Sequence, residues 1–246
     1  MEIIAHRGAS GYTPENTRVS ILKGLELDCD GFEVDVQLTS SGEVVVFHDF
    51  TLERTTSGSG SLRDKKLYEL KKLDLGNWFS EEFKGEKIMT LKELLEVVPK
   101  NKILNIEIKV RYDEINKIEV EVVEILKKAR RIEGNIIISS FNHRIIKEIN
   151  RLEPRLKAGL IFKAGVLDIE NYIKINNLKI YSIHSSGEFT GREMVKKMNE
   201  IGIKIYIWTV NSVEEAKILK DFGVTGIITN FPDKFRGLRG IRKVKS

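Results

Sequence analysis

The chain has 246 residues, of which 41% are hydrophobic and 31% charged, with a formal net charge of +5 at pH 7. This composition excludes a disordered chain, and no apolar run is long enough to span a membrane. The single cysteine, Cys29, excludes an intramolecular disulfide and a cysteine-rich metal site, and we interpret it as a small buried residue. Met1 leads directly into a predicted strand without a secretory signal, so we expect a cytoplasmic protein.

The positive charge does not predict a nucleic-acid partner, because Lys and Arg alternate with Glu and Asp along most of the chain. This pattern is typical of solvated helix faces. The one basic cluster without acidic residues, 236–245, is interpreted as a frayed tail. Many Lys, Glu and Ile residues with few Gln indicate a thermophilic source, on composition alone.

Eight apolar runs rich in β-branched residues predict strands. In chain order they are 2–6, 31–37, 102–109, 135–140, 157–162, 179–184, 204–208 and 226–229. Between these runs, apolar residues at three- and four-residue spacing predict helices. The helices are expected at 16–27, 90–98, 113–130, 143–151, 168–175, 190–201 and 213–222.

The alternation of strands and helices predicts an α/β fold, a (β/α)8 TIM barrel formed by residues 1–246 as a single domain. The strands are apolar almost throughout, as expected for parallel strands buried on both faces. A doubly wound open sheet is the alternative, but no glycine-rich phosphate loop follows the first strand.

Residues 49–89 are predicted to form a small insertion between the second strand and its helix, because structureless loops of this length are rare in compact domains. We expect the insertion to follow the strand that carries Glu33, Asp35 and His48, and so to rise from the catalytic end of the barrel. Trp78 and Phe79 are expected to be buried anchors of this insertion, whereas Phe50 is a candidate substrate contact.

Charged side chains lie near the ends of two predicted strands. Because side chains alternate along a strand, Glu33 shares one face with Asp35, and Glu107 shares one face with Lys109. In a barrel these faces point inward, toward the end where barrel enzymes place their sites. Three carboxylates repel one another unless a cation bridges them, and oxygen ligands select Mg2+ or Ca2+, with Mn2+ as an alternative. Glu33, Asp35 and Glu107 therefore predict one divalent metal ion; the other interpretation is a structural ion-pair network with Lys109 and Arg7.

His6 and His48 each end an apolar run and are followed by Arg7 and Asp49 respectively. Two histidines in such places predict an acid/base pair. Arg7 offers a planar guanidinium for a phosphate group, and Asp49 could orient His48.

Three further side chains are weaker candidates. His143 is interpreted as a surface or helix-capping residue, and His184 as a minor pocket candidate. Trp208 could stack on the substrate or fill the barrel mouth.

Short motifs follow one another in a fixed order along nearly the whole chain. They are HRG at 6–8, PENT at 14–17, EVD at 33–35, HD at 48–49, LERTT at 52–56, LDLGNWF at 73–79, EIK at 107–109, SSFN at 139–142, WTVN at 208–211 and the turn at 229–232. In this order the motifs resemble the glycerophosphodiester phosphodiesterase family. The chain departs from the family pattern at Met89, where a proline is common, and at Asn230, where an aspartate is common. Neither position is expected to contact the metal or the phosphate directly, although the turn at 229–232 is a weak pocket candidate.

The resemblance implies a TIM barrel that hydrolyses glycerophosphodiesters to an alcohol and sn-glycerol 3-phosphate, within glycerol and lipid metabolism. It implies three metal ligands, an acid/base pair and two phosphate-binding side chains: Glu33, Asp35 and Glu107; His6 and His48; Arg7 and Lys109. The expected partner is a small-molecule glycerophosphodiester, with no nucleic acid and no stable membrane insertion. The sequence leaves open the alcohol, the native ion, the oligomeric state, which histidine is the acid, and whether water or the glycerol 2-hydroxyl attacks.

Two alternative functions remain at this point. One is a lysophospholipase D or phospholipase C-like activity on lipid phosphodiesters, which would need an apolar, membrane-facing mouth. The other is a non-catalytic phosphodiester-binding barrel, which would be expected to lack a metal ligand or a histidine. A zinc amidohydrolase is disfavoured, because the first strand has no His-x-His pair.

Overall fold

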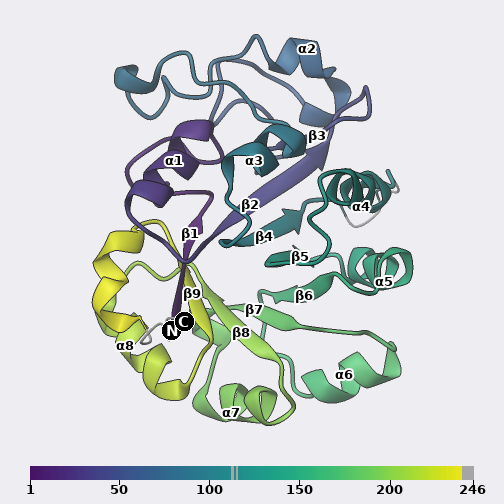
Figure 1. Ribbon diagram of the computed structural model, residues 1–246, viewed down its shortest axis with the longest axis vertical. Helices are drawn as coiled ribbons and strands as arrows, with labels where there is room; N and C mark the ends of the chain where they lie inside the picture. Colours follow the sequence, from purple (N-terminus) through teal and green to yellow (C-terminus); the bar gives the residue numbers. More distant parts are fainter. Residues whose placement is uncertain (112–113, 115, 240–246) are drawn as a thin grey trace.

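The computed structural model describes residues 1–111, 114 and 116–239. Within these residues, nine strands form one sheet, and all except the short β3 run parallel. The strands are β1 (Glu2–His6), β2 (Gly31–Leu38), β3 (Val44–Val46), β4 (Ile103–Ile108), β5 (Ile136–Ser140), β6 (Lys157–Phe162), β7 (Ser182–Ser186), β8 (Lys204–Trp208) and β9 (Gly226–Thr229). β9 pairs with β1, and β1 pairs with β2, so the parallel strands close into a barrel (Figure 1). The predicted TIM barrel is therefore confirmed.

Helices surround the barrel and connect successive strands (Figure 1). They are α1 (Arg18–Glu26), α3 (Leu91–Val97), α4 (Ile118–Lys128), α5 (His143–Leu152), α6 (Ile169–Ile175), α7 (Arg192–Glu200) and α8 (Val213–Phe222). Side chains at their first residues support these helix starts: the Thr90 hydroxyl accepts a hydrogen bond from the backbone N–H of Glu93, as its capping-box pattern predicts. Gly223, with φ of 88°, ends α8 in the left-handed conformation that glycine adopts most easily.

The second strand shows how alternation separates the core from the site. Phe32, Val34 and Val36 are fully buried and pack in the apolar layer beneath the helices. Glu33 and Asp35 alternate with them and are buried on the inner side of the barrel. The apolar half of the strand thus stabilises the barrel, while the charged half is free to form a site.

Most predicted elements differ from the observed ones by one or two residues at an end, and two elements differ by more. The strand expected at 179–184 is observed as Ser182–Ser186, because β7 continues its pairing with β8 as far as Ser186 and Trp208. The helix expected at 113–130 begins at Ile118, and residues 112, 113 and 115 lie outside the described part of the chain. Residues 240–246 of the expected basic tail also lie outside it.

The placement of His48 on the second strand is wrong. A turn follows β2, in which the backbone N–H of Gly42 donates to the carbonyl oxygen of Thr39. The chain then returns as β3, antiparallel to β2, and His48 lies two residues beyond β3. The polar residues 39–43 close this hairpin by local hydrogen bonds, so one apolar run is in fact two strands.

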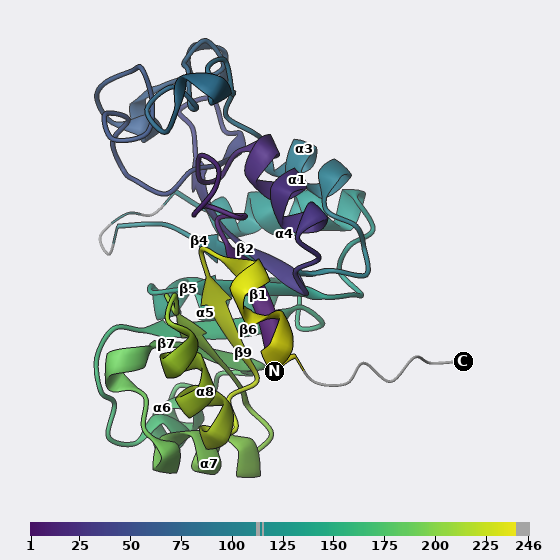
Figure 2. The same ribbon diagram turned by 90° about the vertical axis from the view of Figure 1, so that its left-hand side faces the viewer.

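The segment 49–89 lies between β3 and α3, beyond the end of β2 (Figures 1 and 2). It contains the short helix α2 (Leu67–Leu70) and the 3-10 turns η1 (Leu62–Asp64) and η2 (Glu81–Phe83). Its buried side chains form a cluster of their own with residues of β3 and its end: Val45, Phe47, Leu52, Leu62, Leu70, Leu75 and Ile88. This segment therefore has a small aliphatic core next to the barrel.

The expectation that Trp78 is a buried anchor is wrong, because 40% of Trp78 is exposed. Its indole N–H donates to the carbonyl oxygen of Leu75, and its ring meets Phe79 edge-on at 5.6 Å between centroids. Aliphatic side chains and the ring of Phe47 fill this core, and the indole, which needs a hydrogen-bond acceptor, remains at the surface.

Cys29 is fully buried, as expected, and burial raises the pKa of its thiol to about 12. Among the described residues, none of the helices combines the length and the apolar character needed to cross a membrane.

The small core of the segment 49–89 gives a stability prediction. Leu70→Ala should lower the free energy of unfolding by about 2–5 kcal/mol, because it removes a fully buried side chain. Trp78→Ala should lower it less, because the indole is exposed. Urea denaturation measures both, with Tyr68→Ala in the same helix, at a 60% exposed residue, as control. A larger loss for Trp78→Ala than for Leu70→Ala would contradict this account of the core.

Candidate active site

A cavity of about 320 Å³ lies at the carboxyl ends of the barrel strands. The lining side chains that the sequence predicted as site residues are His6, Arg7, Glu33, His48, Glu107, Lys109 and Trp208. Thr209, which follows Trp208 in the WTVN motif, lines it too, as do Asn105, Phe141 and Lys163, which were not predicted as site residues. Residues from all nine described strands, or from the loops that follow them, thus line one space.

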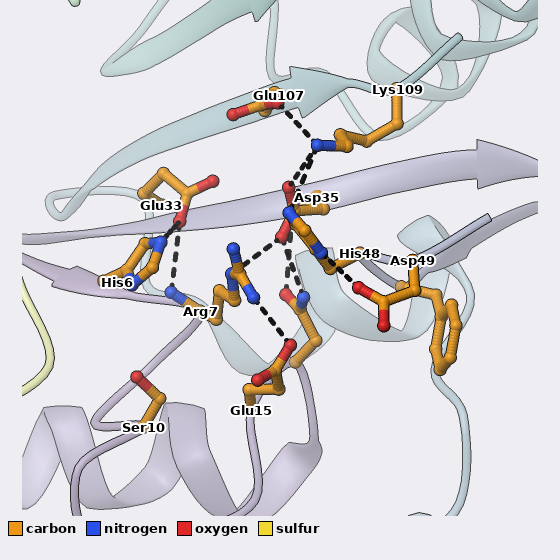
Figure 3. A network of polar contacts seen from close by, with 12 residues as sticks. His6, Arg7, Ser10, Glu15, Glu33, Asp35, His48, Asp49, Glu107 and Lys109 are labelled. Atoms are coloured by element: carbon orange, nitrogen blue, oxygen red, sulfur yellow. Dashed lines mark hydrogen bonds and ion pairs between the residues drawn. The ribbon is translucent and has the colours of Figure 1, made fainter. Parts of the chain in front are cut away.

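Three carboxylates converge beside this cavity. Ligand oxygens of Glu33, Asp35 and Glu107 all lie within 4.8 Å of one another (Figure 3). The register of parallel β2 and β4 causes this, because Asp35 is paired directly with Glu107, and Glu33 is two residues earlier on the same face. Glu33 and Asp35 are 3% and 1% exposed.

Burial and mutual repulsion change how these carboxylates hold protons. Burial, and then the charge of Asp35, raise the pKa of Glu33 well above its usual range and that of Glu107 to about 7. Burial acts on Asp35 in the same direction, but Arg7 and other cations keep its pKa low. An all-oxygen donor set whose ionised forms repel one another fits a hard divalent cation.

Arg7 is held in place from three directions. Its backbone N–H donates to the carbonyl oxygen of Glu33 at 2.8 Å and to the carboxylate of Glu33 at 3.1 Å. Its guanidinium donates to Glu15 Oε1 at 2.7 Å, and its Nε lies 3.3 Å from Asp35 Oδ2 (Figure 3). The backbone of Arg7 has a φ of 55°, which turns the chain out of β1 directly at the cavity.

Lys109 lies at the junction of the carboxylates and His48. Its Nζ is 3.2 Å from Glu107 Oε1, 3.9 Å from Asp35 Oδ1 and 3.2 Å from His48 Nε2. The ammonium group donates, so the imidazole accepts at Nε2 in this arrangement. Two of the three carboxylates thus form ion pairs with Lys109 or Arg7, and such a network was the other interpretation of this cluster.

His6 is fixed by Asn230, a residue of the turn that follows β9. His6 Nδ1 lies 2.7 Å from Asn230 Oδ1, and because a carbonyl oxygen only accepts, Nδ1 donates. Its Nε2 lies 3.9 Å from Glu33 Oε2. Burial, and then the charge of Arg7, lower the pKa of His6 to about 4. Asn230 does not line the cavity itself and acts on it through His6, because the turn after β9 returns to the end of β1.

His48 is fixed by a carboxylate. Its Nδ1 lies 2.5 Å from Asp49 Oδ1, so Asp49 does orient it. Arg54 donates to both oxygens of Asp49, at 2.6 and 2.9 Å, and although partial burial opposes it, this lowers the pKa of Asp49 to about 2. Burial lowers the pKa of His48.

Arg54 and Asn16 are contacts that sequence reasoning missed. Arg54 also donates to both oxygens of Glu15, at 2.7 and 2.9 Å, and Glu15 accepts from Arg7. Asn16 donates to Asp35 at 3.0 Å from a backbone with φ of 57°. Asn16 belongs to the PENT motif and Arg54 to the LERTT motif. These motifs supported the family resemblance, but the sequence did not show which side chains they contact.

The weaker candidates divide between the cavity and its surroundings. Trp208 lines the cavity and meets Phe141 edge-on, with centroids 5.7 Å apart. His184 is buried at the cavity, and burial lowers its pKa to about 3. Phe50 does not line this cavity; it lines a separate, much smaller one, with its ring centroid 5.2 Å from the Arg111 guanidinium.

The surface or capping role expected for His143 is wrong. The cap of α5 is Asn142, whose side chain accepts from the backbone N–H of Arg144. His143 is half-buried, with Nδ1 at 2.7 Å from the Tyr172 hydroxyl and Nε2 at 3.1 Å from the carbonyl oxygen of Ile161. It joins α5 to β6 and α6.

The site can be compared with known proteins. Residues 6–234 match the model of the glycerophosphoryl diester phosphodiesterase family. The chain belongs to this family. It is therefore a phosphoric diester hydrolase, as the motifs implied.

Relatives of the family match over nearly their whole length. A glycerophosphodiester phosphodiesterase of Caldanaerobacter subterraneus is 39% identical over 232 residues, covering 94% of each chain. A solved Oleispira antarctica phosphodiesterase, in complex with the product sn-glycerol-3-phosphate, has a TM-score of 0.88 and 30% identity, covering 96% of each chain. The glycerophosphodiester phosphodiesterase of Thermotoga maritima has a TM-score of 0.79 and 32% identity, covering 96% of this chain and 97% of that chain.

The contacts of Arg54 predict how its replacement changes the kcat of phosphodiester hydrolysis. Arg54→Met should lower kcat about 10- to 100-fold, because Asp49 and Glu15 lose the group that holds them against His48 and Arg7. Arg54→Lys should retain a kcat between those of the wild type and Arg54→Met, since an ammonium group cannot bridge two carboxylates as a planar guanidinium does. Steady-state kinetics test this, with Arg63→Met, at a half-exposed residue outside the cavity, as control. Wild-type kcat in Arg54→Met would show that the bridge has no role.

Proposed function

We propose that the chain is a metal-dependent hydrolase that converts glycerophosphodiesters to an alcohol and sn-glycerol 3-phosphate. The observation that supports this most directly is the shared cavity. It brings a carboxylate cluster, two imidazoles and two cations together at the carboxyl ends of the barrel strands. The product found with the Oleispira antarctica relative indicates the same chemistry for this chain.

Glu33, Asp35 and Glu107 would hold one divalent ion, Mg2+ or Ca2+, with Mn2+ as an alternative, because all their donors are oxygens. When bound, such an ion polarises the phosphoryl oxygens and lowers the pKa of an attacking hydroxyl group. Asn16 and Arg7 contact Asp35 from the other side, which keeps its carboxylate oriented.

Arg7 and Lys109 bind the phosphate group of the substrate. Both cations are already positioned by carboxylates, so little side-chain freedom is lost on binding. A guanidinium has five N–H donors and an ammonium three, so donors remain for phosphate oxygens. Trp208 provides an apolar wall on the far side of the cavity for the carbon atoms of the substrate.

His6 and His48 are the acid/base pair. They lie on different sides of the carboxylate cluster, His6 beside Glu33 and His48 beside Lys109 (Figure 3). One removes the proton of the attacking hydroxyl, and the other protonates the leaving alcohol oxygen. Asn230 and Asp49 each bind Nδ1 of one ring, which directs Nε2 of both rings to the reaction.

The whole chain acts as one domain, with residues 49–89 as an insertion. Arg54 of this segment binds Glu15 and Asp49, so the segment completes the site rather than forming a separate unit. Phe50 lies next to Arg111 behind Lys109, so we place it as a support for this side of the cavity.

Removal of the metal tests the carboxylate cluster. Exhaustive EDTA treatment should abolish turnover, and Mg2+, Mn2+ or Ca2+ should restore it. An ion at 100 times its Kd should also raise the free energy of unfolding by about 2.7 kcal/mol, because it binds only the folded state. Asp35→Asn should lose both effects, whereas Asp64→Asn, at an exposed residue, should keep them. Full activity of demonstrably metal-free protein would rule out this role.

Replacement of the histidines tests the acid/base pair. His6→Ala and His48→Ala should each lower kcat about 10²–10⁴-fold while the protein remains folded, the range for positioned acid/base groups. His143→Ala removes an imidazole outside the cavity and should keep kcat near the wild-type value. Kinetics and circular dichroism measure both properties. Retained activity in a folded His6→Ala or His48→Ala protein would favour a structural role.

A further inference from the structure

Lys163 lines the cavity from the strand that lies opposite β1 in the barrel. It directly follows β6, and in the order of the closed barrel β6 is four strands from β1 in either direction. The metal-binding and acid/base side chains come from β1, β2 and β4 and from the loop after β3. Lys163 is exposed, so its ammonium is accessible to a ligand in the cavity.

The cations that line the cavity differ in their partners. Arg7 is bound by Glu15 and Asp35, and Lys109 by Glu107. Across residues 1–111, 114 and 116–239, Lys163 forms no ion pair or hydrogen bond. Two cations are therefore neutralised by built-in carboxylates, while the third has none.

An apolar wall lines the same cavity, and its Phe141 ring centroid lies 5.8 Å from Lys109 Nζ. Phe141 follows β5 and Trp208 ends β8, and their rings meet at an interplanar angle of 86°. Phe141 is 44% exposed at the cavity. Because Arg7, Lys109, this wall and Lys163 line one cavity, a substrate whose phosphate lies at Arg7 and Lys109 has room to extend an ester branch along the wall toward Lys163.

We propose that Lys163 binds a negatively charged group on the alcohol branch of the substrate, of which a carboxylate is the simplest case. This inference rests on the proposed function and adds a preference among its substrates. In the proposed function Arg7 and Lys109 bind the anionic phosphate and the glycerol branch is uncharged, so the alcohol is the part of the substrate left to supply a counter-charge to Lys163. The site then favours anionic alcohols over neutral ones and disfavours cationic alcohols such as choline, because like charges in one cavity repel.

Two substrates that differ in one group test this proposal. In sn-glycero-3-phosphoglycerol the alcohol is neutral; in sn-glycero-3-phosphoglycerate, esterified through the 3-hydroxyl of glycerate, a carboxylate replaces one CH2OH group. The readout is the ratio of kcat/KM for the glycerate diester to that for the glycerol diester, so effects common to both cancel. Lys163→Met should lower this ratio about 5-fold, the size expected for one partly exposed ion pair.

Further variants separate charge from shape. Lys163→Arg should restore the ratio, Lys163→Glu should lower it further and improve glycerophosphocholine, and high salt should reduce all these differences. Lys174→Met, on α6 of the same βα unit and outside the cavity lining, is the matched control and should keep the wild-type ratio. An unchanged ratio in Lys163→Met, or an equal change in Lys174→Met, would overturn this inference and leave the proposed function standing. Failure of the wild type to hydrolyse any of the three diesters would overturn the proposed function, and this inference with it.

Discussion

The burial of three carboxylates in one barrel cavity is the constraint on which the rest of the site depends. Glu33, Asp35 and Glu107 leave water and approach within 4.8 Å, so their ionised forms repel one another without the screening of bulk solvent. Arg7 and Lys109 reduce this repulsion, and the pKa values of Glu33 and Glu107 remain raised even so. The cluster is thus incompletely neutralised by the protein, which leaves a place for a cation of higher charge.

Each compensating cation requires support of its own, and this explains the segment 49–89. Arg7 depends on Glu15, and His48 depends on Asp49 for its orientation. Arg54 binds both acids, and it belongs to a segment with its own aliphatic core next to β3. The buried core of the segment fixes the position of the Arg54 guanidinium. A short polar loop has no such core and would not fix it.

Local patterns predicted those parts of the site that depend on one strand at a time. Alternation along β2 and β4 placed Glu33, Asp35 and Glu107 on inward faces, because the two-residue period is a property of every strand. His48 was misplaced, because the hairpin at 39–43 is closed by hydrogen bonds between ordinary polar residues. Asn230 is 224 positions from the His6 that it binds, and such a pairing depends on barrel closure, which no short window of sequence contains.

The two sides of the cavity differ in how tightly the fold determines them. The side formed by β1, β2 and β4 is a dense network in which most charged atoms bind another, so one substitution there leaves its partners unpaired. On the side that follows β5 and β6, Phe141 and Lys163 are exposed; Phe141 contacts Trp208 and Lys109 through its ring, and Lys163 forms no ion pair or hydrogen bond with the described residues. Changes there disturb little packing. The barrel thus joins a fixed side, where the phosphate would react, to a permissive side, where the alcohol would be selected, and preference among alcohols could change without loss of the fold.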